Sequence, residues 1–238
     1  MATVAIVVSC EAAGADRSYA LDLEAAAEEY TVPLTWLIHA SPADPMSNIK
    51  LYHTEYLHRI PSWHEIGLLA GFEGSHGHIE GERERIEAIC LGKDLMKQCH
   101  VKPTCIRAVR DDLRATDLKQ LESLGFIVAI AGPVEPCTGH VPGHPSPGAA
   151  PYHPSYQDIN TEGDSSILVA SVASGHGVCG DLQHGWAAIR PILEGAGPDA
   201  VVVLSVADTA DRAADLREAL GFCRARGDRF ATATALAG

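Results

Sequence analysis

Charged side chains stand at or near the ends of short apolar runs in this sequence. Glu11 comes shortly after the run 4–8, and Arg107 lies inside the run 104–109. Burial raises the pKa of a carboxylate, so Glu11 could act as a general acid or base. Arg107 could bind a substrate carboxylate or orient an acid; the alternative is a structural ion pair with Glu11 or a nearby aspartate. We predict that Glu11 and Arg107 are catalytic and that Asp208 contacts the substrate.

Histidines in two glycine-rich segments suggest further site residues. The motif GSHGH at 74–78 carries His76 and His78, and His176 stands in a second glycine-rich turn. A histidine pair supplies fewer ligands than a zinc site needs, and no CxxC or HxxxH motif accompanies His176. We therefore predict no metal ligands here. Instead, His76, His78 and His176 are expected to line a substrate pocket together with Glu73.

The elements that must position these side chains follow from the apolar pattern. Short β-branched runs alternate with longer amphipathic stretches, which is typical of repeated βα units. The pattern predicts strands at 4–8, 32–39, 65–70, 104–109, 126–131, 167–172, 201–206 and 230–234, and helices at 21–30, 48–58, 80–99, 117–124, 184–193 and 209–226. In a parallel barrel the carboxyl ends of the strands surround one site, so Glu11, Arg107 and Asp208 should meet there.

Composition limits the class of protein and its partners. The chain has 238 residues with a net charge of −13, and it contains no basic stripe that could neutralise nucleic acid or an anionic membrane. Its apolar runs are only strand-length. Neither a repeat nor a linker divides the chain, so one domain over 1–238 is expected. The segment 133–163 is rich in Pro, Gly and His and predicts a functional loop. Scattered, odd-numbered cysteines and the lack of a secretory signal predict a cytoplasmic protein.

Several segments together resemble the polysaccharide deacetylases, the NodB-homology group of carbohydrate esterases. They include VPLTWL at 32–37, HEIG at 64–67, TCIRA at 104–108, PYHPS at 151–155 and RFATA at 229–233. They occur in the family's order and cover almost the whole chain. The resemblance implies a distorted (β/α) barrel of about seven or eight parallel strands.

The resemblance also implies which residues should carry chemistry, and here the sequence departs from the family. The family's catalytic base falls on Ser9 or Cys10, depending on the alignment, and its metal-binding acid falls on Glu11. Its two histidine ligands fall on Leu69 and Glu73. Leucine has no lone pair to donate, so the usual metal-dependent mechanism is not expected and no cofactor is predicted.

Two functions remain open. The late catalytic histidine of the family falls on Ser205, whereas the family's motif arginine is kept as Arg107. One hypothesis is a metal-independent hydrolase that cleaves a C–N or acyl bond in a small polar, sugar-like or amide substrate. The superfamily includes cofactor-independent allantoinases, so loss of the metal need not end activity. The other hypothesis is a non-catalytic relative that binds carbohydrate or serves as a scaffold. Polar groups at the strand ends favour the enzyme.

Overall fold

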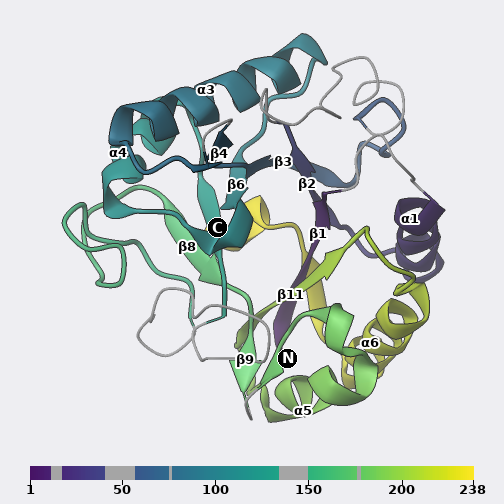
Figure 1. Cartoon of the computed structure of the whole chain (residues 1–238). Coiled ribbons are helices and arrows are strands. Elements are labelled where there is room, and N and C mark those ends of the chain that lie inside the picture. Colours follow the sequence, from purple (N-terminus) through teal and green to yellow (C-terminus); the bar gives the residue numbers. More distant parts are fainter. Residues whose placement is uncertain (12–17, 41–56, 75–76, 134–149, 176–177) are drawn as a thin grey trace.

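A single curled, parallel β-sheet dominates the computed structural model of the protein (Figure 1). The structure describes residues 1–11, 18–40, 57–74, 77–133, 150–175 and 178–238. Strands of the sheet are β1 (Thr3–Cys10), β2 (Thr35–His39), β3 (Glu65–Ala70), β6 (Cys105–Ala108), β7 (Val128–Ala131), β8 (Leu168–Ser171), β11 (Val201–Ala207) and β12 (Arg229–Ala231). Their order is β11-β1-β2-β3-β6-β7-β8, and β12 pairs with the first residues of β1.

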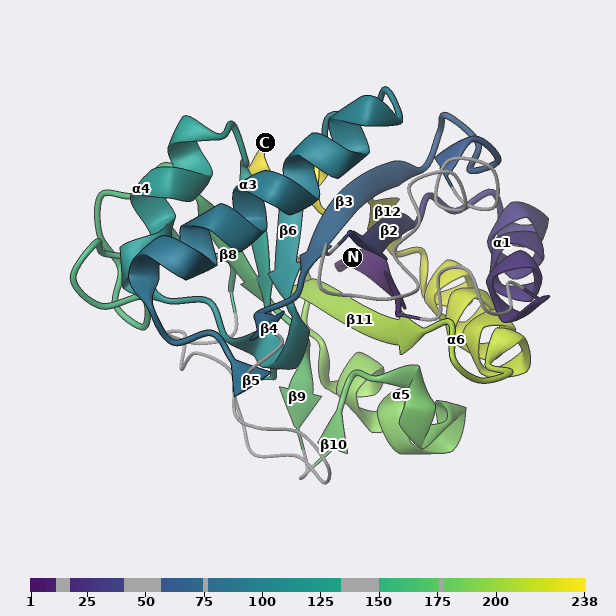
Figure 2. The same ribbon diagram turned by 45° about the horizontal axis from the view of Figure 1, so that its top comes forward.

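Helices cover the outer face of this sheet (Figure 2). They are α1 (Ser18–Tyr30), α3 (Glu82–Gln98), α4 (Ala115–Ser123), α5 (Trp186–Gly195) and α6 (Ala213–Arg226). Three short 3-10 turns, η2 (Val109–Asp111), η4 (Leu182–His184) and η5 (Thr234–Ala237), and two hairpins, β4–β5 (Glu73–Gly74 with Gly77–His78) and β9–β10 (Ser174–Gly175 with Val178–Cys179), complete the described elements. None of the helices in these ranges has the length and apolar character needed to cross a bilayer.

In the part of the chain that the structure describes, the two ends of the sheet meet through single bridges rather than a full ladder. Val172, just after β8, forms a parallel bridge with Val203, and Asp181 forms another with Ser205. The backbone N–H of Ser205 donates to Gly180 at 2.8 Å. The sheet is therefore a distorted (β/α) barrel, as predicted.

Two apolar clusters lie on opposite faces of the sheet. The inner cluster comprises Ala5, Val7, Leu37, Leu69, Cys105, Val128, Ile130, Leu168, Ala170, Val172, Val203 and Ala233. The outer cluster takes the alternate residues of the same strands, such as Ile6 and Leu68, and packs them against the helices. Because side chains alternate along a strand, one set of residues fills the interior of the barrel and the other set packs under the helices.

The predicted elements agree with the structure except near some ends. Strand 32–39 begins only at Thr35, two residues after Pro33, which has no N–H to donate. The helix predicted at 209–226 begins at Ala213. Gly125 ends α4 with φ of 79°, the left-handed conformation expected of a residue after a helix. The helix predicted at 48–58 lies almost wholly outside the described residues, and so does 134–149, the first half of segment 133–163.

Glu65 lies at the amino end of the barrel, where its carboxylate joins several segments of the chain. Its carboxylate accepts hydrogen bonds from the hydroxyl of Thr35 at 2.9 Å and from the backbone of Thr234 at 3.1 Å. The hydroxyl of Thr234 also donates to it. Glu65 therefore ties the carboxyl-terminal segment to the barrel, on the end opposite the predicted site.

His64 beside it is held in its neutral form. The backbone N–H of Leu34 donates to Nδ1 of His64 at 2.9 Å, so this nitrogen carries no proton. Burial lowers the pKa of His64 to about 4. The ring also stacks on Trp63 with the centroids 3.9 Å apart.

We expect this histidine to make stability depend on pH. Its pKa is lower in the folded chain than in the unfolded chain, so only the unfolded state takes up a proton as the pH falls from about 6.5 to 4. That should cost on the order of 3 kcal/mol of unfolding free energy over this interval. In His64→Asn, whose amide oxygen can still accept from Leu34, the dependence should be flatter. Urea unfolding at several pH values measures it, and equal slopes for both proteins would contradict the assignment.

Candidate functional site

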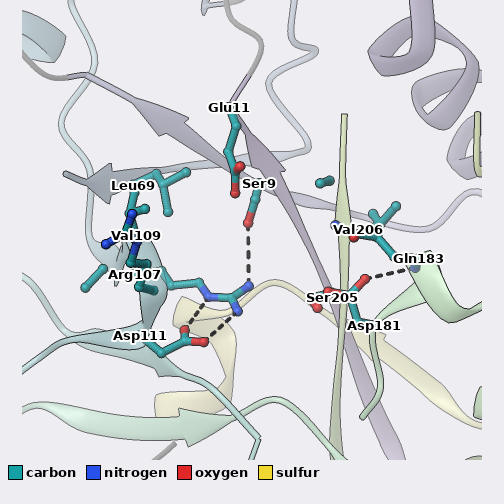
Figure 3. A pocket seen from close by; sticks show the side chains of 13 residues that line it. Ser9, Glu11, Leu69, Arg107, Val109, Asp111, Asp181, Gln183, Ser205 and Val206 are labelled. Atoms are coloured by element: carbon teal, nitrogen blue, oxygen red, sulfur yellow. Dashed lines mark hydrogen bonds and ion pairs between the residues drawn. The ribbon is translucent and has the colours of Figure 1, made fainter. Parts of the chain in front are cut away.

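A pocket of about 130 Å³ lies at the carboxyl ends of the barrel strands (Figure 3). It is lined by Ser9, Glu11, Leu69, Arg107, Ala108, Val109, Arg110, Asp111, Asp181, Gln183, Ser205, Val206 and Ala207. Both predicted catalytic residues, Glu11 and Arg107, are thus found in one pocket, at the end of the barrel where the topology predicted a site.

The alternation along the strands decides which side chains reach this pocket. Ser9 continues the inward series of β1, whereas Cys10 belongs to the outer cluster under the helices. Of the two residues on which the family's catalytic base could fall, Ser9 is the one that lines the pocket. Leu69 and Arg107 are direct partners in the β3–β6 register, so Arg107 lies beside a member of the inner apolar cluster.

Arg107 and Asp111 form the central ion pair of the pocket. Nε of Arg107 donates to Oδ1 of Asp111 at 2.8 Å, and Nη2 donates to Oδ2 at 3.2 Å. The third nitrogen, Nη1, faces the hydroxyl of Ser9 at 3.5 Å. Arg107 is 8% exposed. Burial disfavours its charge, but the Asp111 carboxylate outweighs this, so the pKa of Arg107 is raised.

An unusual backbone presents Asp111 to the arginine. Arg110 and Asp111 both have positive φ, 63° and 56°, a conformation that costs energy for side chains other than glycine. A Cβ on Gly132 would lie 2.5 Å from the Asp111 carboxylate, so only glycine leaves room there. The next residue, Asp112, turns the other way and accepts a hydrogen bond from Arg85 at 2.7 Å. The two consecutive aspartates thus pair with different arginines, Asp111 with Arg107 and Asp112 with Arg85 and Arg114.

Glu11 stands at the mouth of the pocket with its carboxylate pointing inward (Figure 3). The residue as a whole is exposed, and it forms part of the pocket wall. Burial raises the pKa of Glu11; Arg107 acts in the opposite direction, and the charges of Asp208 and Asp181 raise the pKa further. A carboxylate with these neighbours is suited to exchange protons.

Asp208 supports Glu11 from behind the strand end. Its Oδ1 accepts the backbone N–H of Glu11 at 3.0 Å, and its own N–H donates to the carbonyl of Ser9 at 3.1 Å. Asp208 is fully buried and is not among the residues that line the pocket. The structure therefore places it as a residue that positions Glu11, and its predicted contact with substrate stays a prediction.

Asp181 and Gln183 line the pocket although sequence reasoning did not single them out. Asp181 follows β10, is 4% exposed, and accepts the N–H of Gln183 at 2.9 Å. The bridge between Asp181 and Ser205 places this segment at the barrel rim. The sequence signal for Asp181 is its place beyond the predicted strand 167–172, in the same glycine-rich segment as His176.

The remaining predicted residues are not united with this pocket by the structure. Nε2 of His78 lies 2.9 Å from Oδ2 of Asp112, and the described lining of the pocket does not include it. Glu73 pairs with His78 in the β4–β5 hairpin. His76 and His176 lie outside the described residues. Substrate contacts by these four residues stay predictions.

A divalent metal, as the deacetylase resemblance would imply, does not fit the described residues of the pocket. Leu69 presents an isobutyl group where a ligand would be needed. The guanidinium of Arg107 lies beside it and would repel a cation. In the described ranges, no three His, Cys, Asp or Glu side chains are grouped so that they could hold a metal ion. The carboxylate of Asp111 is instead directed at Arg107, and that of Asp181 accepts the backbone N–H of Gln183.

Comparison of sequences finds no matching family model and no matching curated protein. Comparison of structures does find relatives. A protein from Mycobacterium smegmatis assigned as a polysaccharide deacetylase superposes with a TM-score of 0.66 at 15% identity, covering 99% of this chain and 88% of its own. A mutant of a CE4 family pseudoenzyme with restored enzymatic activity gives 0.60 at 9% identity, covering 99% and 67%.

A family 4 carbohydrate esterase from Streptomyces lividans, solved in complex with acetate, gives a TM-score of 0.57 at 11% identity, covering 96% of this chain and 91% of its own. Identities this low establish the architecture alone. The structural similarities agree with the resemblance to polysaccharide deacetylases that the ordered sequence segments indicated. The chain has the fold of the CE4 polysaccharide deacetylases.

Proposed function

We propose that this protein is a metal-independent, deacetylase-like hydrolase of a C–N or acyl bond in a small polar substrate, with Glu11 as its general acid and base. One observation carries the proposal. Glu11 points into the pocket with a raised pKa, while the nearby arginine is already paired with Asp111. A structural ion-pair partner would show the opposite arrangement, with its pKa held low by the arginine.

The pocket residues suggest how such a hydrolysis would run. Glu11 accepts a proton from a water molecule as that water attacks the carbonyl carbon of the substrate. Nη1 of Arg107 donates a hydrogen bond to the oxygen on which negative charge develops. Glu11 then returns the proton to the leaving nitrogen or oxygen as the bond breaks. The hydroxyls of Ser9 and Ser205 orient the substrate.

The second candidate is a non-catalytic carbohydrate-binding protein. It is favoured by the loss of the metal ligand at Leu69, and some proteins that share this fold are pseudoenzymes. A binding protein would use the same carboxylates and hydroxyls to hold sugar hydroxyls. The two candidates differ in whether the titration of Glu11 matters.

Replacement of Glu11 should not destabilise the fold, whereas replacement of Asp111 should. The raised pKa means that Glu11 stabilises the fold when protonated, and that this contribution is lost as the pH rises through its folded pKa. Glu11→Gln mimics the protonated form, so its melting temperature at pH 7 should equal or exceed that of the wild type. Asp111→Asn leaves Arg107 without its partner carboxylate and should cost about 3 kcal/mol.

Both variants can be measured by thermal melts and denaturant unfolding. If Glu11→Gln lowers the melting temperature as much as Asp111→Asn does, Glu11 is structural and the catalytic role is wrong. Once a turnover assay exists, Glu11→Gln should reduce kcat roughly a hundred- to ten-thousand-fold. A turnover rate unchanged in Glu11→Gln would also contradict the proposal.

Removal of metal should leave the protein unaffected. Because Leu69 cannot coordinate, the purified protein should carry less than one equivalent of zinc, and EDTA should not change its melting temperature. Elemental analysis and melts with and without chelator measure this. Stoichiometric zinc together with a chelator-sensitive melt would contradict it and would direct attention to His76 and His78.

The role of Asp208 can be tested through the pKa of Glu11. Asp208→Asn keeps an oxygen that can accept the Glu11 N–H but removes a negative charge that raises the pKa of Glu11. The pKa of Glu11, followed by carbon-detected NMR of its carboxyl group, should fall. Asp164→Asn, at an exposed aspartate, is the matched control and should leave it unchanged. An unchanged pKa in Asp208→Asn would remove Asp208 from the site.

A further inference from the structure

Arg107 is not available to bind a carboxylate of a ligand. A guanidinium holds a carboxylate through two parallel hydrogen bonds, and Asp111 already takes Nε and Nη2 of Arg107. Only Nη1 remains toward the pocket, next to the hydroxyl of Ser9. This arginine can therefore offer a ligand one donor but not a bidentate fork. The anchoring of a substrate carboxylate, one of the two roles considered for it from sequence, is disfavoured.

The charges that line the pocket favour a positive ligand. Three carboxylates, those of Glu11, Asp111 and Asp181, face two guanidinium groups. One of these belongs to Arg110, which is exposed at the rim. The pocket thus carries an excess of negative charge within a chain whose net charge is −13. A ligand carboxylate would meet repulsion, and an ammonium group would be attracted.

Ser205 gives an independent sign that a ligand is expected. It is 2% exposed, and its Oγ has no hydrogen-bond partner among the described residues. It follows Val203 by two positions on β11, so it shares the inward face of that strand, and it lines the pocket. A buried hydroxyl left unpaired costs free energy, which a polar ligand would recover by bonding to it.

We propose that the pocket binds the end of a small molecule that carries a primary ammonium group next to a hydroxyl, and that it rejects the corresponding carboxylate. The carboxylates of Glu11 and Asp181 accept from the ammonium group, which has three donors, and Ser205 bonds to the hydroxyl. The volume of about 130 Å³ admits only a few heavy atoms. The inference rests on the proposed function in taking this pocket as the working site, but it concerns binding alone.

Three matched compounds test the proposal: serinol, glycerol and glycerate, which place an ammonium, a hydroxyl and a carboxylate on similar three-carbon skeletons. Titration of the whole protein at constant ionic strength, followed by amide NMR shifts, gives the dissociation constants. Serinol should bind tighter than glycerate on the order of ten-fold or more, with glycerol between them. The shifted amides should include those around Ser205.

Variants separate this site from general attraction to an acidic protein. Ser205→Ala should weaken serinol binding several-fold, whereas Ser123→Ala, at an exposed serine of α4, should not. Glycerate binding as tightly as serinol, or a serinol dissociation constant unchanged in Ser205→Ala, would overturn the proposal. A further outcome is that serinol binds selectively while Glu11→Gln lowers the melting temperature as much as Asp111→Asn does. That combination would contradict the hydrolase proposal and leave the binding inference standing.

Discussion

The pair between Arg107 and Asp111 is the constraint around which the carboxyl end of the barrel is built. A nearly buried guanidinium above an apolar barrel interior is tolerable only with a fixed counter-charge. Placing the Asp111 carboxylate beside Arg107 requires positive φ at both Arg110 and Asp111, and a glycine, Gly132, next to the carboxylate. The geometry also determines what the arginine can still do, because its fork is filled from within the chain. Because Asp111 neutralises Arg107, the carboxylate of Glu11 is not needed as its counter-charge and can exchange protons.

A second arginine shows the same logic on the outer face of the barrel. Arg85 is fully buried; it bonds Asp112 and Asp117, both at 2.7 Å, and its guanidinium lies 3.8 Å from the centroid of the Phe72 ring. It links α3 to α4 and to the loop that follows β6. Because Asp111 and Asp112 are adjacent in sequence, this outer network anchors the backbone that offers Asp111 to the pocket.

Much of the fold could be predicted from sequence, because short apolar runs between amphipathic stretches are a local signal, and most strands of the barrel are such runs. The meeting of Glu11 and Arg107 also followed from topology, since the ends of parallel strands share one rim. The pairing of Arg107 with Asp111 could be foreseen only as one option among several. Its selection depends on left-handed residues that carry no pattern in the sequence. Asp181 was overlooked because it follows a two-residue strand, too short to produce any periodic signal.

The closure of the barrel between β8 and β11 has a dynamic consequence. Among the described residues the wall consists here of two isolated bridges, and one of them joins Asp181 to Ser205. Few backbone hydrogen bonds need to break for this seam to part, so it is a natural place for local opening far below the free energy of global unfolding. Both residues of the seam also face the pocket. A molecule bound between them would hold the two sides of this seam together. Ligand binding to the pocket and local opening of the seam would then be coupled equilibria.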